Sequence, residues 1–329
     1  MNECNRDGKH ANESLRFVQL SDLHLSSIGI PNPLCLLNKR ILGYLSWLRK
    51  RRHTHQRWVL DLAIDKLKEL SIDHCTITGD LTHIGLKNEF EQVQSWLAKL
   101  GSPENVTLIP GNHDLYVNER WSKSFKLWEK YLYGDSSPNS SFEYTDNALT
   151  QLNQFYPIVR IRKHVAFIGL NSAFNAPWFR ATGYIHDQEI ERLKNILSSP
   201  ELNDFCKVLL IHHPITLTHT PPRKRLINHE ALKSLLYDYP VNLVLHGHGH
   251  HSCSEYIATK DTANIPVIGM SSSSSISQKP NYEAEFILFE ISQEPEGWSI
   301  QKQSYTLDLH QRGFTANQQQ CFFSTRNCT

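Results

Sequence analysis

The sequence predicts an α/β fold in which a largely buried sheet is covered by helices. Short apolar runs of strand length alternate along the chain with longer stretches whose apolar residues recur at helical spacing. Polar clusters stand directly after five of the short runs. Strands that alternate with helices are typical of layered α/β proteins, in which the loops after the strands converge on a site.

The length and charge of the chain set broad limits on its class. With 329 residues it can bury a large core in one or two domains, and no repeat or linker divides it. We expect a polar N-terminal segment over 1–14, a single domain over 15–307, and a peripheral Gln/Asn-rich tail over 308–329. The net charge of +1 argues against a stable nucleic-acid partner.

Targeting signals are not visible in the sequence. The N-terminus has no apolar segment of the kind found in signal peptides, and no run of about 18 apolar residues predicts a transmembrane helix. The seven cysteines lack CxxC spacing, which favours reduced thiols over a disulfide framework or a zinc knuckle. These features predict a cytoplasmic protein.

The first predicted strand, 15–20, runs into Asp22 and His24. Side chains two residues apart in an extended segment point the same way, so these two could hold one ion. The alternative is a helix cap at Asp22 and a solvated His24.

Residues 31–57 form a predicted insertion with a basic amphipathic helix. Its apolar stripe, at spacings of three and four, comprises Leu34, Leu37, Ile41, Tyr44, Leu45 and Leu48. Its basic residues are Lys39, Arg40, Arg49, Lys50, Arg51, Arg52 and Arg57. Such a helix is typical of membrane surfaces, although a helix packed on the domain with a solvated basic face would show the same pattern. The absence of acidic residues between Pro31 and Gln56 favours an anionic partner.

Two further strands end in polar clusters after this insertion. A helical pattern over 58–70 precedes the strand 75–78, which ends at Gly79-Asp80. Another helix, 88–100, leads to the run 106–109 and then to Gly111, Asn112, His113 and Asp114. We expect Gly111 to allow a tight turn that places an amide, an imidazole and a carboxylate at one point.

The second half of the chain continues the alternation. Between 121 and 197 we expect a helix, a polar loop at 134–147, two strands within 157–170, a loop at 171–183 and a helix that begins at Asp187. The run 207–211 ends at His212-His213-Pro214, and 241–245 ends at the histidines 246, 248, 250 and 251. Strands are also expected at 265–269, 285–291 and 298–305.

Taken together, the five clusters predict a metal site. Carboxylate and imidazole ligands suit Zn, Fe or Mn, and a carboxylate can bridge two ions. Two ions about 3.5–4 Å apart can clamp the attacking and leaving oxygens of a displacement at phosphorus. Any single cluster could be a structural turn, but five clusters at five strand ends favour a site.

The order of the clusters, DxH, GD, GNHD, HHP and GHxH, resembles the calcineurin-like metallophosphoesterase family from Asp22 to His251. The resemblance implies a four-layer α/β/β/α sandwich of two mixed sheets. It also implies two divalent ions, with Mn²⁺ preferred and Fe or Zn as alternatives. One ion would be held by Asp22, His24 and His250; the other by Asn112, His212 and His248, with His213 as the fallback for His212. Asp80 would bridge the ions.

The same resemblance assigns the catalytic roles. His113 would act as the acid or hydrogen-bond donor, and Asp114 would orient its ring.

The insertion suggests a substrate class. A lipid-linked phosphate could lay its acyl chains on Leu37 and Ile41, with phosphates facing Arg49 and Arg52. The basic run at Arg223 and Arg225 could reach an anionic head group. This pattern is similar to the UDP-2,3-diacylglucosamine pyrophosphatases of lipid A synthesis, particularly the chlamydial form. Such an enzyme would release UMP and 2,3-diacylglucosamine 1-phosphate, with peripheral contact at the cytoplasmic face of the inner membrane.

Two other functions stay open from the sequence. The first is a soluble 3′,5′-cyclic nucleotide phosphodiesterase, for which the 31–57 helix would pack inward. The second is a non-enzymatic scaffold similar to the retromer subunit with this fold. Scaffolds of that kind have lost ligands, whereas all five motifs are intact here.

Overall fold

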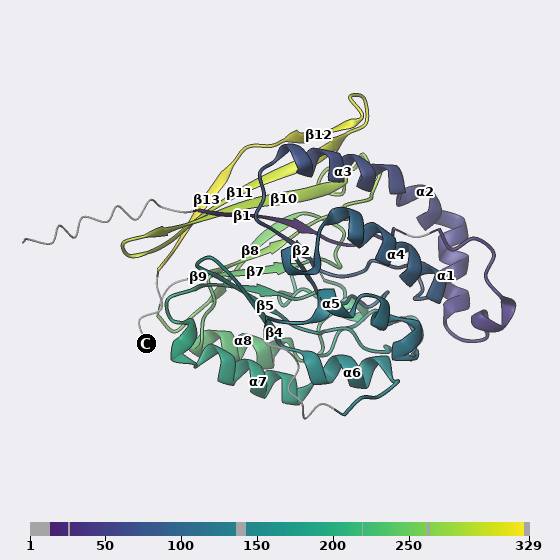
Figure 1. The fold of residues 1–329 in the computed structure, drawn as a ribbon, viewed down its shortest axis with the longest axis horizontal. Helices are drawn as coiled ribbons and strands as arrows, with labels where there is room; N and C mark the ends of the chain where they lie inside the picture. Colours follow the sequence, from purple (N-terminus) through teal and green to yellow (C-terminus); the bar gives the residue numbers. More distant parts are fainter. Residues whose placement is uncertain (1–13, 26, 136–142, 219, 262–263, 326–329) are drawn as a thin grey trace, which may run out of the picture.

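A computed structural model of the protein describes residues 14–325 except 26, 136–142, 219 and 262–263. It shows two mixed β-sheets stacked face to face between helical layers, as Figure 1 illustrates. The predicted α/β/β/α arrangement is therefore confirmed. The polar segment 1–13 and residues 326–329 lie outside the described residues.

The first sheet joins the start of the chain to its end. Its strand order is β12-β11-β10-β1-β2-β3, and β13 also pairs with β11. The bounds are β1 (Leu15–Leu20), β2 (His74–Ile77), β3 (Val106–Leu108), β10 (Glu285–Glu294), β11 (Gly297–Asp308), β12 (Gly313–Ala316) and β13 (Gln320–Thr325). The strand β1 is parallel to β2 and antiparallel to β10.

The second sheet has the order β4-β5-β6-β7-β9-β8, with four parallel strands in the centre. The bounds are β4 (Ile158–Arg162), β5 (Val165–Gly169), β6 (Cys206–Leu210), β7 (Leu243–His246), β8 (Cys253–Ala258) and β9 (Asn264–Gly269). The edge strands β4 and β8 are antiparallel to their neighbours.

Helices cover the outer face of each sheet (Figure 1). The first sheet is covered by α3 (Arg57–Glu69) and α4 (Lys87–Leu100), and α5 (Glu129–Leu132) contacts β3. The second is covered by α6 (Ala148–Phe155), α7 (Asp187–Leu197) and α8 (His229–Asp238). None of the described helices has the length and apolar character needed to span a bilayer.

The core lies between the sheets and is largely aromatic at its centre. Phe17 on β1 stacks on Phe289 of β10 at 5.0 Å and meets Phe167 of β5 edge-on at 4.9 Å, so one ring joins the two sheets. All three rings are fully buried. This rigid centre fixes the ends of β1, β2, β3, β6 and β7 relative to one another.

The insertion is helical but not one continuous helix. It consists of a 3₁₀ turn (Pro33–Leu36), α1 (Arg40–Ser46), a π turn (Trp47–Arg51) and α2 (Arg52–Thr54). Wide turns of this kind hold an extra residue and are frequent at functional sites. Trp47 and Arg51 are four residues apart, which is about one full turn of this wide helix, so both side chains lie on the face that packs on the protein.

Two contacts anchor the insertion on the domain. Trp47 packs against Ile84 and Leu86, and the Arg40 guanidinium donates to the carbonyl of Ile84 and pairs with Glu119.

The C-terminal segment differs from the peripheral tail that we expected. β12 and β13 pair with β11 at the edge of the first sheet, and Phe314 is buried while Phe322 packs against the core. The sheet therefore extends beyond residue 307. These edge strands are short, and their apolar residues do not form the longer alternating run that predicts a strand.

Candidate metal centre

The structure brings the five polar clusters together at one end of the two sheets. They follow β1, β2, β3, β6 and β7, so the carboxyl ends of parallel strands from both sheets supply them. Backbone hydrogen bonds tie neighbouring clusters: Asp22 N donates to Gly79 O at 2.9 Å, and Gly247 N donates to His212 O at 3.2 Å.

The backbone at five of the seven predicted ligands is left-handed, not extended. Positive φ angles occur at Asp22 (50°), His24 (40°), Asp80 (57°), His248 (64°) and His250 (53°). Our expectation of an extended segment at Asp22 and His24 was therefore wrong. Both residues are left-handed, with Leu23 between them, and their side chains still lie in one donor set. Such backbone costs on the order of 1 kcal/mol or more per residue and is typical of functional sites.

Glycines near these residues let the loops approach closely. A Cβ on Gly111 would overlap the Asp80 carboxylate, and one on Gly79 would lie 2.7 Å from His212 Nδ1. Of these two glycines, Gly79 alone has a positive φ. Gly111 is thus required for close approach rather than for the tight turn that we expected.

One donor set surrounds Asp22, His24 and His250. His250 Nε2 lies 3.1 Å from Asp22 Oδ1 and 3.4 Å from His24 Nε2. The Nδ1–H of His24 donates to Thr82 O at 2.8 Å, which leaves Nε2 to face the set.

A second donor set surrounds His212. Its Nδ1–H donates to Thr78 O at 2.7 Å, and its Nε2 lies 3.1 Å from Asn112 Oδ1. His248 belongs to this set through its ring, 5.1 Å from that of His212. The fallback His213 also offers a nitrogen within 4.8 Å of those of His212 and His248.

Asp80 lies between the two sets, as a bridging ligand must. Its Oδ2 is 3.4 Å from His212 Nε2 and 4.0 Å from His24 Nε2. Its Oδ1 accepts a hydrogen bond from the backbone N–H of His113 at 2.7 Å, which fixes the carboxylate.

The donor spacing fits divalent ions. Ligands that share an ion with bonds of about 2.1 Å lie roughly 3–3.5 Å apart, and most of the separations above fall in this range. In addition, His248 Nε2 is buried without a hydrogen-bond partner among the described residues. An orphaned buried nitrogen that faces carboxylates and imidazoles is the state expected of a metal ligand.

The electrostatics agree with this fit. Burial, reinforced by neighbouring histidines, holds the pKa values of His24 and His248 well below the usual range, so both rings are neutral as ligands must be. Burial opposes ionisation of Asp80, but His212 and His113 outweigh it and lower the pKa of that carboxyl. Burial lowers the pKa of His212, but the attraction of the Asp80 carboxylate outweighs burial and raises the pKa of this imidazole to about 9. A bound ion would displace that proton.

His113 is oriented differently from our expectation. Its Nδ1–H donates to His83 O at 2.5 Å, which leaves Nε2 to accept a hydrogen bond from Arg51 at 2.9 Å. The Asp114 carboxylate instead accepts from Gly111 N, Leu81 N and both the N–H and hydroxyl of Thr82. Asp114 therefore clamps the loop after β3 to the loop after β2 and does not orient the imidazole.

Two adjoining cavities open beside the donor sets, with volumes of about 680 and 360 Å³. Asn112, His113, Arg51 and Lys224 line both of them. These shared residues show that the cavities meet at the second donor set.

Of the predicted substrate-binding residues, some line a cavity and others do not. Arg223 lines the smaller cavity. The exposed Arg49 and Arg52 line neither cavity, and the Arg225 guanidinium donates to Thr220 O. Leu37 and Ile41 are exposed on the outer surface of the insertion, where an amphiphile could reach them.

Sequence reasoning did not single out three residues of the site: Arg51, His55 and Lys224. All three lie in basic runs whose members look alike in sequence. The π turn selects Arg51 over its neighbours, and the turn at 222–224 selects Lys224 over Arg225. His55 is buried beside His24 with ring centroids 4.5 Å apart.

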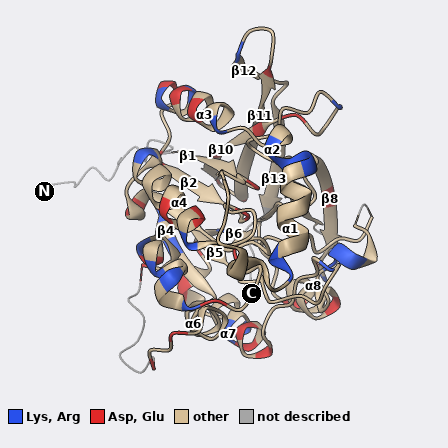
Figure 2. Cartoon of the chain, turned by 90° about the vertical axis from the view of Figure 1, so that its right-hand side faces the viewer, with Lys and Arg blue, Asp and Glu red and all other residues tan. Residues whose placement is uncertain are grey.

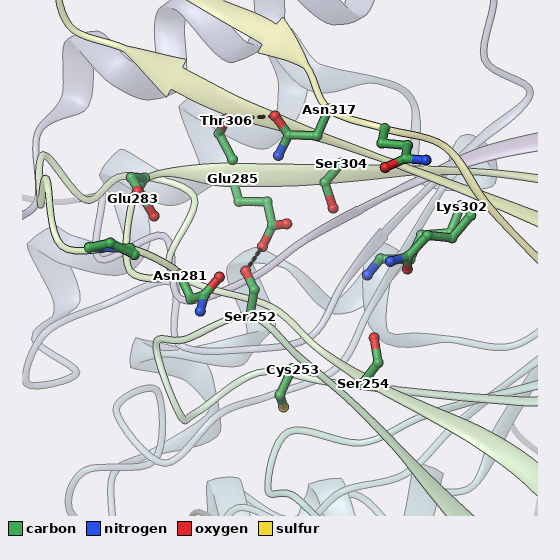
Figure 3. A pocket seen from close by; sticks show the side chains of 13 residues that line it. Ser252, Cys253, Ser254, Asn281, Glu283, Glu285, Lys302, Ser304, Thr306 and Asn317 are labelled. Carbon is green, nitrogen blue, oxygen red and sulfur yellow. Dashed lines mark hydrogen bonds between the residues drawn. The ribbon is translucent and has the colours of Figure 1, made fainter.

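A third cavity, of about 570 Å³, lies between the two sheets at their open edge (Figure 3). β8 borders it on one side and β10 and β11 on the other; within it the Glu285 carboxylate accepts a hydrogen bond from Ser252. Lys302 points its buried stem into the same space. The groups of three or more metal-type ligands found among the described residues all lie elsewhere, so this cavity is not the candidate site.

Comparison with known proteins agrees with the geometry. The chain resembles the crystal structure of a dimetal phosphatase from Danio rerio, with a TM-score of 0.55, 13% identity, and coverage of 95% of this chain and 99% of that one. Lower similarity is found to vacuolar protein sorting 29 from Cryptosporidium parvum (TM-score 0.40, 10% identity, coverage 94% and 99%). A Thermus thermophilus sulfate thiohydrolase gives a TM-score of 0.43 at 13% identity, with coverage of 94% and 56%. No curated protein sequence matches significantly.

A family model supplies the assignment. The calcineurin-like phosphoesterase model matches residues 15–252, more than half of the chain and all five ligand clusters. Membership implies two divalent ions at the donor sets described above and the metal-dependent hydrolysis of phosphate esters. The chain belongs to the calcineurin-like phosphoesterase family.

Proposed function

We propose that this phosphoesterase hydrolyses a lipid-linked nucleotide pyrophosphate, specifically UDP-2,3-diacylglucosamine, to UMP and 2,3-diacylglucosamine 1-phosphate. The proposal places it at the cytoplasmic face of an anionic inner membrane, with Mn²⁺ as the native ion. The observation that carries it is a row of exposed apolar side chains on the insertion and on the facing loop, two segments that both line a cation-rich cavity ending at the metal centre.

The apolar row lies on the insertion and the loop that faces it. Leu34 is 72% exposed and Leu37 is 79% exposed, and Phe179 across the cavity is 80% exposed. Trp178 beside Phe179 is also exposed. Exposed large apolar side chains favour an apolar ligand or a membrane, and Phe179 also lines the smaller cavity.

The cavity behind this row is suited to phosphates. Its lining includes Lys39, Arg51, Arg180, Arg223 and Lys224, and its described residues include no carboxylate. Figure 2 looks onto this face and shows Lys and Arg at both ends of α1 and on a loop beside α8. Closely spaced cations focus a positive potential into the cavity, which attracts an anionic head group.

The bound ions, Arg51 and His113 would have different catalytic roles. When bound, the two ions would supply Lewis acidity and an activated water. Arg51 can donate to a phosphoryl oxygen and stabilise the charge that develops there, as arginines do in other phosphoryl-transfer sites. Burial, reinforced by Arg51, lowers the pKa of His113 to about 3, so its ring is neutral before substrate binds. A phosphate that draws Arg51 away would add negative charge beside His113 and favour a proton on Nε2, which could pass to the leaving oxygen.

The test compares UDP-2,3-diacylglucosamine in detergent with cyclic AMP and bis(p-nitrophenyl) phosphate, each with Mn²⁺. We expect UMP release from the lipid at a kcat/KM well above that for either soluble ester. Turnover of cyclic AMP alone would overturn the lipid assignment and make the protein a soluble cyclic-nucleotide phosphodiesterase.

A double variant tests the role of the apolar row. Leu34→Ser with Leu37→Ser should raise KM for the lipid about tenfold, because each leucine loses roughly 0.7 kcal/mol of apolar contact, close to the value for one buried CH₂ group. It should leave bis(p-nitrophenyl) phosphate hydrolysis unchanged. The matched control is Ile161→Ser, an exposed apolar residue on β4. Equal effects of the double variant on both substrates would show that the row does not bind lipid.

A further inference from the structure

We propose that His55, supplied by the insertion, is an additional protein ligand of the ion held by Asp22, His24 and His250. This inference rests on the dimetal centre but not on the lipid substrate. It makes the insertion part of the metal site rather than only a cover over it.

The first argument is proximity. One ring nitrogen each of His24, His55 and His250 lies within 4.8 Å of the other two. The ring of His55 is 4.5 Å from that of His24 and 5.5 Å from that of His250, edge to face in both cases. His55 thereby adds a third imidazole to a donor set that already holds two carboxylates.

The second argument is orientation. His55 Nδ1 lies 2.9 Å from the hydroxyl of Ser274 and 3.2 Å from that of Ser272. With Nδ1 engaged there, Nε2 is the nitrogen left to face the cavity that His55 lines beside Asp80 and His250. A hydrogen bond that fixes the tautomer and directs the other nitrogen inward is the usual outer support of a metal-bound imidazole.

The third argument is that the backbone holds this position firmly. His55 pairs with Ser275 in an isolated β-bridge, and Gln56 N donates to Ser274 O at 2.9 Å. The Ser272 hydroxyl in turn donates to Asp22 O at 2.7 Å. The serine run thus connects His55 directly to the loop that carries Asp22.

A purely structural role explains these contacts less well. If the side chain at position 55 only filled space, an apolar residue would be more favourable there than a histidine. An imidazole brings a buried polar nitrogen close to the nitrogens of His24 and His250, and such a nitrogen needs a partner. An added nitrogen donor also has a chemical consequence, because imidazole favours Zn or Fe relative to Mn. His55 is therefore expected to narrow the margin by which this ion site prefers Mn²⁺ over Zn²⁺ or Fe²⁺.

The experiment measures metal binding to the full-length protein, without substrate. Metal-free wild type and His55→Ala are titrated with Co²⁺ by calorimetry and by visible absorption. We expect two ions in wild type, and in His55→Ala a tenfold or greater loss of affinity for one ion together with a changed ligand-field spectrum. His310→Ala, an exposed histidine that lines neither cavity of the metal centre, is the control and should leave both readouts unchanged.

Two further variants guard against misfolding. His55→Gln can keep the bond to Ser274 while its amide is a weaker ligand, and it should repeat the loss of affinity. Ser274→Ala keeps the imidazole but loses its support, and should show a smaller loss. Unchanged affinity and spectrum in a folded His55→Gln variant would overturn the proposal, while failure of wild type to bind two ions would instead contradict the dimetal centre itself.

Discussion

The metal centre and the insertion at 31–57 differ in burial and in how they are held in place. The ligands of the centre lie at strand ends fixed by the aromatic core, and backbone hydrogen bonds between loops hold them. All of them except the partly exposed His250 are buried. The insertion is anchored by Trp47 and Arg40 but exposes much of its apolar surface. The comparison teaches that rigid strand ends hold the metal-type ligands, whereas the insertion adds exposed apolar surface beside them.

The largest expected effect on hydrolysis comes from removing a ligand of the metal centre. Asp80→Ala removes the carboxylate that lies between both donor sets, and should lower Mn²⁺-dependent hydrolysis of bis(p-nitrophenyl) phosphate on the order of 10³-fold or more. Circular dichroism should show an intact fold. The control is Asp65→Ala, which removes an exposed carboxylate from α3. Activity within about tenfold of wild type would contradict a bridging role.

An intermediate effect is expected where the two regions meet. Arg51→Met removes the guanidinium that the π turn delivers to His113, and should lower kcat about 10- to 100-fold on any phosphodiester. The neighbouring Arg52→Met keeps the composition of the insertion but changes an exposed side chain outside the cavities. If both variants lose activity equally, the charge of the insertion as a whole, rather than Arg51 itself, is what matters.

The smallest effect concerns the loop that faces the insertion across the smaller cavity. Its first residue, Asn171, donates its N–H to Glu189 on α7 at 2.7 Å. Burial raises the pKa of Glu189 to about 8 from its ordinary 4.5. The folded state therefore holds this proton more tightly than the unfolded chain does, so the stability contributed by the group is present below pH 4.5 and is lost as pH rises through 8.

Glu189→Gln should remove this dependence. The free energy of unfolding should fall less steeply than in wild type between pH 4.5 and 8, by up to about 1.4 kcal/mol per pH unit. Denaturant titrations at several pH values measure the difference, with the exposed Glu191→Gln on the same helix as control. Parallel pH profiles for wild type and Glu189→Gln would show that this carboxyl is not protonated in the fold.

The metal centre was easier to predict from the sequence than the insertion. The strands 15–20, 75–78 and 241–245 were found within one or two residues because each is a short apolar run that ends in polar residues. The ligand types followed from those endings. What the sequence did not show was the left-handed backbone at Asp22 and His24, since local spacing alone suggests an extended segment.

The residues of the insertion were harder to assign. Arg49, Arg51 and Arg52 are equivalent in composition, and only the π turn decides which of them reaches His113. His55 carries no local signal, because its role depends on serines more than 200 positions away. The edge strand β13 lacks apolar alternation and gains its place only by pairing with β11.

The left-handed ligands have a consequence for how such a protein can change over generations. At these five positions the backbone favours glycine, whereas the chemistry requires aspartate or histidine. Replacement by glycine would relieve about 1 kcal/mol of strain in the metal-free chain while it abolishes a ligand. Backbone strain taken alone therefore favours the loss of a ligand at these positions, and the buried hydrogen bonds of the ligands and the free energy of metal binding oppose it.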